Sequence, residues 1–208
     1  SGLLDGMKVL VGNDANVAAL GEMWQGGGKG YSNLVAVTLG TGVGGGIIID
    51  GRILTGTNGA GGEIGHIHIE DAETETCGCK NKGCLEQYAS ATGVTRLANR
   101  RLAKDDAPSV LRGGEISAKT VFDAVKAGDR VAIEIAEQFG EYLGKGLAVV
   151  ANVVDPQIFV IGGGVSKAGD ILFKYIEPSY KKCAFGPCKQ AKFALATPVS
   201  YTHLTLPT

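Results

Sequence analysis

Residues 34–53 read LVAVTLGTGVGGGIIIDGRI, and this stretch decides the fold. An apolar, β-branched run at Leu34–Leu39 is followed by the glycine-rich segment 40–46, a second apolar run and the Asp50-Gly51 pair. Apolar runs joined by glycine-rich turns are typical of antiparallel strands, and an Asp-Gly pair is a strong hairpin signal. A flexible linker would lack the apolar runs. We therefore predict strands at Leu34–Leu39, Gly44–Ile49 and Arg52–Thr55.

The glycine-rich segment has more than one interpretation. Gly40–Gly45 reads GTGVGG, which formally matches the dinucleotide-binding pattern G-x-G-x-x-G. That pattern requires a strand before it and a helix after it, and here a second strand follows. A glycine-rich hairpin instead presents bare backbone N–H groups that suit a phosphate, and Thr41 adds a hydroxyl donor. The alternative is a tight hairpin whose glycines serve only twist and backbone geometry.

Outward from this hairpin, strands are followed by a block of helices and one closing strand–glycine–helix unit. Such an order predicts an α/β domain with layered packing. The expected elements are a strand at Met7–Val11, a helix capped by Asn13 or Asp14 and running to Trp24, a short strand at Ile67–Ile69, helices over Leu85–Ala103, Ser117–Ala127 and Asp129–Val154, a strand at Ile158–Ile161, and a helix reaching Ile176.

Composition restricts the class of protein. The chain has 208 residues, 33 of them glycine, with 44% hydrophobic residues and a formal net charge of −1. The hydrophobic content is enough for a packed core, and the near-neutral charge argues against a dedicated nucleic-acid binder. No apolar run approaches the roughly 18 residues of a membrane span, and the start has no signal-peptide layout. We therefore expect a cytoplasmic globular protein that binds neither nucleic acid nor membrane.

The cysteines form a second decisive pattern. Cys77, Cys79 and Cys84 are spaced C-x-C-x4-C, and His66 lies upstream of them. Three thiolates and one imidazole are typical of a structural tetrahedral zinc site. Disulfides are disfavoured because there is no secretory signal and three cysteines cannot all pair within the cluster. His68 is an alternative ligand, because an alternating strand would place it on the same face as His66.

Three carboxylates are candidates for chemistry. Asp14 follows Asn13 at a predicted strand-to-helix junction, where it could be an N-cap or a general base. Glu63 and Glu86 flank the cysteine cluster in the sequence. A surface carboxylate is usually only solvated, but proximity to predicted metal ligands favours a functional role for both.

Five segments together resemble the ROK family (repressors, open reading frames and sugar kinases), most closely its bacterial glucokinase branch. They are GNDANVAALGE (12–22), LGTGVGGGIIIDGRI (39–53), GAGGEIGH (59–66), CGCKNKGCLEQYAS (77–90) and DPQIFVIGGGVS (155–166). The resemblance implies an actin-like, ribonuclease-H-like ATPase fold and phosphate transfer from ATP to a hexose such as glucose. It also implies Mg²⁺ on the ATP phosphates, a structural Zn²⁺ and a homodimer, to which the long helix could contribute.

The same resemblance implies roles for individual residues. Asp14 would be the general base that accepts the proton of the sugar 6-hydroxyl. The sugar contacts would be Asn13, Glu63, His66 and Glu86, and the zinc ligands would be His66, Cys77, Cys79 and Cys84. The phosphate hairpin would comprise Gly40, Thr41, Gly42, Val43, Gly44 and Gly45, and the turn near the adenosine Gly162, Gly163 and Gly164.

The chain also departs from the family pattern at both ends. The phosphate motif D-x-G-G-T is absent, so we expect residues 1–197 to be mainly the larger C-terminal domain, with its zinc loop at 66–84 and impaired activity on its own. Residues 198–208 read PVSYTHLTLPT, have no family counterpart and resemble a translated cloning adapter, so we expect a non-native tail. Other interpretations remain: a kinase for another hexose or an N-acetylhexosamine, a sugar-responsive transcriptional repressor, or a zinc-stabilised binding module.

Overall fold

A five-stranded sheet forms the centre of the computed structural model, which describes residues 13–197. The strands are β1 (Leu34–Leu39), β2 (Val43–Ile49), β3 (Arg52–Ile53), β4 (Ile158–Gly162) and β5 (Lys192–Leu195), in the order β3-β2-β1-β4-β5. Strands β1, β2 and β3 form an antiparallel meander, and β4 and β5 extend it in parallel. The predicted hairpins are confirmed. The expected strand at Met7–Val11 and the tail at 198–208 lie outside the described residues.

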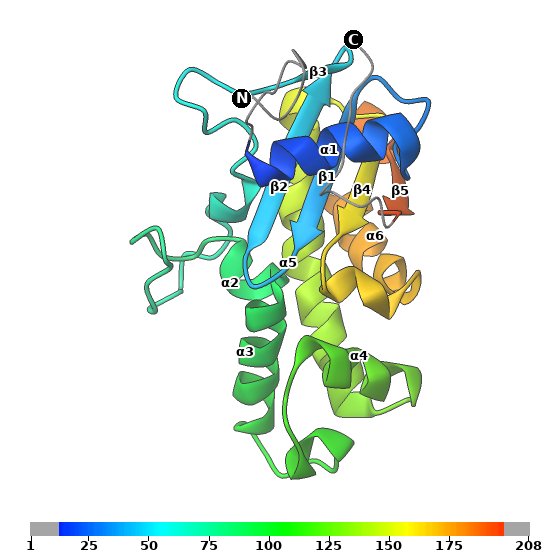
Figure 1. The fold of residues 1–208 in the computed structure, drawn as a ribbon. Coiled ribbons are helices and arrows are strands. Elements are labelled where there is room, and N and C mark those ends of the chain that lie inside the picture. Colours follow the sequence, from blue (N-terminus) through cyan, green and yellow to red (C-terminus); the bar gives the residue numbers. More distant parts are fainter. Residues whose placement is uncertain (1–12, 198–208) are drawn as a thin grey trace, which may run out of the picture.

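Helices cover both faces of this sheet. Figure 1 shows α1 lying across one face and α5 running behind the other, while α3 and α4 extend beyond the end of the sheet. The helices are α1 (Asp14–Gln25), α2 (Glu86–Ala89), α3 (Ala91–Leu102), α4 (Ala118–Lys126), α5 (Arg130–Val154) and α6 (Ile171–Cys183). Short 3-10 turns are η1 (Ile64–His66), η2 (Val110–Gly113), η3 (Val165–Ala168) and η4 (Pro187–Gln190).

Alternation along the strands explains why the sheet is buried on both sides. Successive side chains of a strand point to opposite faces. Leu34 and Ala36 of β1 pack in the smaller core together with Ala19 of α1, whereas Val35 and Val37 belong to the larger core that includes α5. The continuous apolar run of β1 is the pattern expected of a strand that is covered by helices on both faces.

The predicted helix starts are confirmed at three caps. The side chain of Asn13 accepts hydrogen bonds at the start of α1, Ser117 does so at α4, and Asp129 at α5. The predicted continuous helix over Leu85–Ala103 is wrong. It breaks at Ser90, which has extended backbone (φ −89°, ψ 173°), because the N–H of the next residue donates to the carbonyl of Gly40 in the hairpin turn.

Two further predictions differ from the structure. Residues 67–69 form no strand, because their pairing is limited to a single bridge between His68 and Cys84. The helix after the glycine turn begins late, since Gly169 (φ +86°) separates η3 from α6. Sequence analysis also missed β5, which continues the sheet beside β4. Among the described residues, no helix combines the length and the apolar character needed to cross a membrane.

Candidate functional site

Strand β2 supports the first turn of α1, which carries Asp14. A Cβ atom at Gly46 would lie 2.5 Å from the Cβ of Ala19 and 2.7 Å from the carbonyl oxygen of Ala15. A Cβ at Gly44 would lie 3.6 Å from the Cβ of Ala15. The helix therefore rests directly on bare strand backbone, and the two glycines fix how closely Asp14 approaches the sheet.

The neighbouring residues of β2 support the segment that carries Glu63 and His66. A Cβ at Gly45 would lie 2.5 Å from the carbonyl oxygen of Gly62, and one at Gly65 would lie 2.2 Å from the carbonyl oxygen of Val43. Because the backbone approaches β2 closely at Gly62 and again at Gly65, η1 packs directly against the strand. Glu63 and His66, at the two ends of this turn, are exposed to solvent.

Glu86 connects the hairpin turn to the cysteine cluster. A Cβ at Gly42 would lie 2.6 Å from Oε2 of Glu86, so a side chain there would push this carboxylate from its position. On its other side, Oε1 of Glu86 accepts a hydrogen bond from Cys77 Sγ at 2.8 Å and lies 3.6 Å from Nδ1 of His66. The four glycines at 42, 44, 45 and 46 thus bring together three segments that are far apart in the sequence.

Asn13, rather than Asp14, is the N-cap of α1. Its Oδ1 accepts from the N–H of Ala15 at 2.9 Å and of Asn16 at 3.4 Å. Oδ1 of Asp14 accepts from the N–H of Ala15 at 2.8 Å, and both side chains belong to exposed residues. Asp14 is therefore a solvent-accessible carboxylate whose position is fixed by the first turn of α1, as the predicted role of general base requires.

His66, Cys77, Cys79 and Cys84 lie close together, with their ligand atoms all within 4.8 Å of one another. Sγ of Cys79 is 3.5 Å from Sγ of Cys84, and Sγ of Cys77 is 3.9 Å from Nδ1 of His66. Donors around a tetrahedral zinc ion are separated by roughly 3.8 Å. The four residues therefore fit Zn²⁺, and no disulfide joins the cysteines.

The structure selects His66 over the alternative His68. Nε2 of His68 pairs with Asp71 at 2.7 Å, and its Nδ1 lies 2.9 Å from the carbonyl oxygen of Lys82. Burial, together with the hydrogen bond to Glu86, raises the pKa of the Cys77 thiol to about 12. A metal ion would have to displace that proton, since the thiolate is the ligand.

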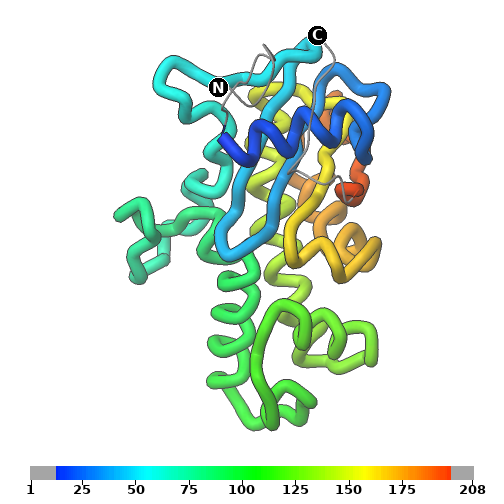
Figure 2. The backbone as a smooth tube through the Cα atoms, viewed as in Figure 1, coloured from blue at the N-terminus to red at the C-terminus, as the bar shows by residue number. Residues whose placement is uncertain are grey.

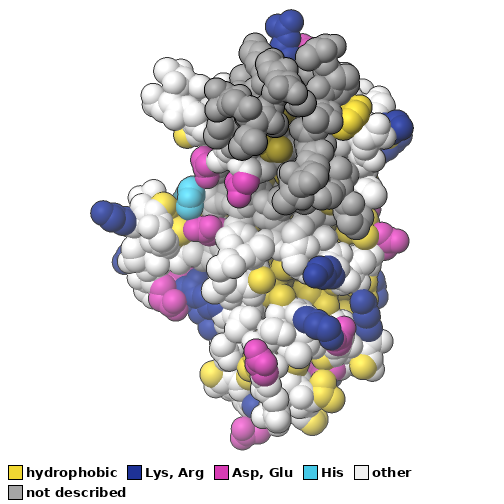
Figure 3. All heavy atoms as spheres, viewed as in Figure 1, with side chains coloured by type: hydrophobic (Ala, Val, Ile, Leu, Met, Phe, Trp, Pro, Cys, Tyr) yellow, Lys and Arg dark blue, Asp and Glu magenta, His cyan; other side chains and the backbone are white. Residues whose placement is uncertain are grey.

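Residues 66–84 project from the flank of the molecule beside α2, as Figure 2 shows. On the face drawn in Figure 3, acidic side chains and a histidine gather on this same flank. The zinc loop therefore lies on one flank of the molecule, next to the α2 turn that carries Glu86.

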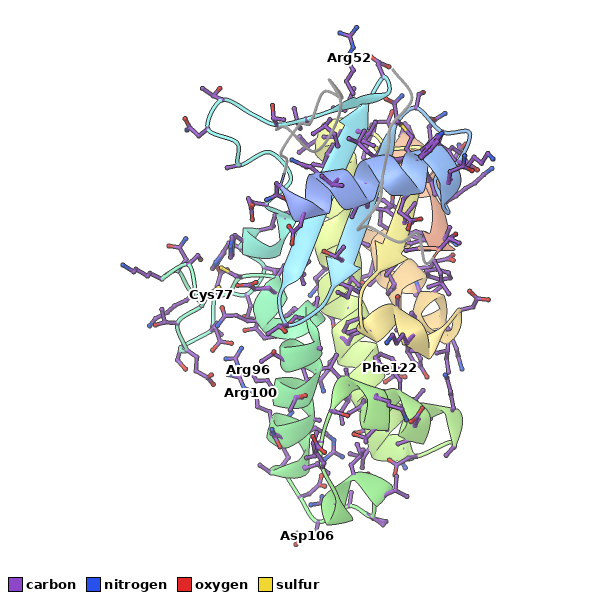
Figure 4. All side chains as sticks on the ribbon, in the orientation of Figure 1. Arg52, Cys77, Arg96, Arg100, Asp106 and Phe122 are labelled. Carbon is purple, nitrogen blue, oxygen red and sulfur yellow. The ribbon has the colours of Figure 1, made fainter. Side chains whose placement is uncertain are left out.

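The turn after β4 forms a second region of interest. Gly163 has φ +87°, and a Cβ there would lie 2.6 Å from backbone atoms of Leu39, so the ends of β4 and β1 touch. Beside it lies a cavity of about 330 Å³ between η3 and α4, lined in part by Gly164, Lys119, Phe122 and Lys167. Figure 4 shows Phe122 on α4. Gly162 and Gly163 do not line this cavity, whereas Gly164 does.

Lys119, Phe122 and Lys167 are three of the residues that line this cavity, and none of them was predicted as a site residue. The helix that carries Lys119 and Phe122 was predicted from its cap, but no pattern in it indicates that it packs beside the glycine turn. The lining combines apolar side chains with Lys167 and with an ion pair between Lys119 and Asp123 at 2.6 Å, and a mainly apolar wall suits a flat apolar group.

Comparisons with known proteins agree with the geometry. The ROK family model matches residues 5–203. Glucokinase of Halalkalibacterium halodurans is 44% identical over 196 residues, which cover 92% of this chain and 59% of that protein. The structure of a ROK family glucokinase from Streptomyces griseus in complex with glucose and AMPPNP superposes with a TM-score of 0.82 at 38% identity, over 92% of this chain and 64% of the other.

A regulator is also similar. A ROK family transcriptional regulator, a homologue of the MLC protein of E. coli, gives a TM-score of 0.81 at 34% identity and covers 92% of this chain and 48% of its own. This chain belongs to the ROK family, and its sheet with helices on both faces is the actin-like ATPase fold of ROK sugar kinases. It spans about 59% of the length of the glucokinase that it matches.

Proposed function

We propose that this chain forms the larger part of an ATP-dependent hexose kinase that phosphorylates glucose at the 6-hydroxyl. One observation carries the proposal: the glycines of the hairpin turn and of β2 gather Asp14, the Glu63–His66 turn and Glu86 around one hairpin. The glucokinase relatives support the same reaction.

In this proposal, Asp14 acts as the general base. Its carboxylate accepts the proton of the sugar 6-hydroxyl while that oxygen forms a bond to the γ-phosphorus of ATP. The bond from the γ-phosphorus to the bridging oxygen breaks, and ADP leaves with that electron pair. Phosphoryl transfer depends mainly on alignment and charge stabilisation, so a carboxylate at a fixed position suffices as the base.

Glu63, His66 and Glu86, together with Asn13, hold the sugar hydroxyls. Fixed polar groups discriminate sugars well, because an analogue that lacks one hydroxyl leaves a buried group unpaired. Kinases for other hexoses or for N-acetylhexosamines would use the same framework, and a substrate panel distinguishes them.

ATP occupies the other side of the hairpin. The backbone N–H groups of residues 40–45 and the hydroxyl of Thr41 face its phosphates, which Mg²⁺ accompanies. The cavity beside Gly164 and Phe122 takes the adenosine, and Lys167 attracts the negative charge of the phosphates.

The His66, Cys77, Cys79 and Cys84 cluster holds a structural Zn²⁺ in this proposal. A bound zinc ion would supply a fixed cross-link within residues 66–84, without Lewis-acid chemistry. The cross-link matters for function because Glu86 contacts Cys77 directly.

A homodimer is part of the proposal as well. Val149 and Val153 lie four residues apart near the C-terminal end of α5, and they are 44% and 79% exposed. Apolar side chains exposed on one helix face favour contact with a second copy.

A coupled ATP–glucose assay on the complete gene product tests the function. Asp14→Asn keeps the shape of the side chain but removes the base, and we expect kcat to fall at least 100-fold because general-base catalysis contributes that much. Asp106→Asn, at the tip far from the sheet in Figure 4, is the control that keeps wild-type turnover. Full turnover in Asp14→Asn would remove Asp14 from its role. A wild-type protein that binds sugar without turnover would favour the repressor or the binding module.

A further inference from the structure

A buried carboxylate lies inside the zinc loop without being part of the cysteine cluster. The side chain of Glu73 is only 1% exposed, and it pairs with Arg96 at 2.6 Å and Arg100 at 3.2 Å. Tyr88 donates its hydroxyl to the same carboxylate. Burial alone would raise the pKa of Glu73, but hydrogen bonds from Tyr88, Glu75 N–H and the two arginines hold it well below its usual range.

Arg96 and Arg100 both come from α3, and both side chains extend from it to the zinc loop. Figure 4 shows Arg96 and Arg100 leaving α3 on the side that faces the loop bearing Cys77. Arg96 also lies 3.1 Å from Glu75, and its guanidinium sits 5.5 Å from the centre of the Tyr88 ring. These contacts fasten residues 73–75 to the helical body independently of any metal.

Arg96 is also linked to the residue that follows Glu86. One of its N–H groups donates to the carbonyl oxygen of Gln87 at 3.3 Å. The amide of Gln87 in turn donates to the carbonyl of Glu75 at 3.0 Å, and its oxygen accepts from the N–H of Cys84 at 3.0 Å. Gln87 is therefore held from three directions, and its backbone neighbour is Glu86.

Glu86 needs such support because α2 is a helix of only four residues. A single helical turn does not hold its shape by its own hydrogen bonds. Tyr88 adds a second brace, since its ring stacks on Tyr142 of α5 at 4.0 Å, and Tyr142 donates its hydroxyl to Glu70 at 3.0 Å. The contacts of Arg96, Arg100 and Tyr142 thus join the zinc loop or the α2 turn to a long helix.

We propose that Arg96 is a positioning residue for Glu86. Through its contacts with Glu73, Glu75 and the carbonyl of Gln87, Arg96 fixes the α2 turn. Arg96 thereby sets the affinity for the hexose without contacting the sugar. The inference rests on the proposed function, in which Glu86 binds the sugar. A positioning role predicts that the main change is in sugar binding. Arg96 contacts Glu73, Glu75 and the carbonyl of Gln87 directly, whereas the phosphate hairpin meets this network only through Glu86 and the first residue of α3.

The test compares Arg96→Met with Arg101→Met in the complete gene product. Arg101 is a matched control on the same helix: its side chain is 11% exposed, against 15% for Arg96, and it too has an ion pair of 2.6 Å, with Glu134. Its partners lie away from the zinc loop. We expect Arg96→Met to raise the KM for glucose about tenfold, with kcat and the KM for ATP within twofold of wild type. Arg101→Met should leave all three within twofold.

Two further variants keep the test informative. Arg96→Lys retains the charge but loses the planar fork, so it should give an intermediate KM. If Arg96→Met does not fold, the Glu73→Gln/Arg96→Met double variant leaves no charge unpaired at that site and should show the same rise in KM. Equal effects of Arg96→Met and Arg101→Met, or an equal fall in kcat, would overturn the inference while leaving the proposed function intact. Absence of glucose phosphorylation by the wild-type protein would overturn both.

Discussion

Gly46→Ala is the substitution that most directly tests the support of Asp14 by β2. The new Cβ would lie 2.5 Å from the Cβ of Ala19 and 2.7 Å from the carbonyl oxygen of Ala15. Ordinary contacts of a Cβ begin at 3.4 Å, so α1 has to move by about 1 Å. Overpacking of this kind destabilises a core by about 1–3 kcal/mol. For a domain of this size the melting temperature should fall by about 2–12 °C.

The larger effect should be on catalysis. A misplacement of about 1 Å at a reacting group can reduce the rate roughly 100-fold. We therefore expect kcat to fall by one to two orders of magnitude, with the KM for glucose changed much less, in a coupled assay at 25 °C where the variant remains folded. Circular dichroism at the assay temperature checks the folded fraction.

Gly45→Ala provides the contrast, because its Cβ would point to the opposite face. There it would lie 2.5 Å from the carbonyl of Gly62 and 2.7 Å from Ile64, so it should displace Glu63 and mainly raise the KM for glucose. Gly114→Ala is the control, since a Cβ at that position meets nothing within 4 Å. Full activity in Gly46→Ala, or the same kinetic pattern in Gly45→Ala and Gly46→Ala, would refute the argument that β2 separates the base from the sugar contacts.

Two further predictions concern the zinc loop. Metal analysis should find close to one zinc ion per chain. Removal of the zinc by a chelator or by Cys79→Ser should weaken glucose binding, measured by titration calorimetry, because the zinc ligand Cys77 contacts Glu86. Unchanged glucose affinity in the metal-free protein would contradict this. Glu73→Gln should lower the stability at pH 7 by about 1–3 kcal/mol, because the buried carboxylate is lost while Arg96 and Arg100 keep their ion pairs with Glu75. The folded-state pKa of Glu73 lies below its ordinary value of 4.5, so its contribution is complete above that pH and is lost on acidification. The difference in urea midpoint between wild type and Glu73→Gln should therefore shrink as the pH falls below 4.5, and a constant difference would show that the carboxylate charge is not responsible.

Local signals explain which parts of the fold could be predicted. The Asp50-Gly51 turn has positive φ at both residues, 50° and 72°, as a two-residue hairpin requires, and that requirement is visible in the sequence. The caps Ser117 and Asp129 likewise act within a few residues of the helices that they start. The break at Ser90 could not be predicted, because it depends on a hydrogen bond to Gly40, fifty residues earlier.

The same distinction applies to the site. The spacing of Cys77, Cys79 and Cys84 predicts a cluster because the ligands are near neighbours in the chain. The choice of His66 over His68 could not be made, since it depends on how Asp71 and Lys82 engage His68. Glu73 lies in a polar stretch that reads as solvated loop, and nothing local indicates burial beneath two arginines.

The glycine excess of this chain is explained by packing more than by flexibility. In the hairpin turn Gly42 leaves room for Glu86, and along β2 Gly45 leaves room for Gly62 and Gly46 for α1. A side chain at each position would therefore disturb a different part of the site. Glu86 is then held by three kinds of contact: the hairpin turn at Gly42, the thiol of Cys77 and, through Gln87, the arginines of α3. Only the second involves a metal ligand. Loss of zinc should therefore loosen the sugar side of the site without dismantling it, because the other two contacts belong to the folded core.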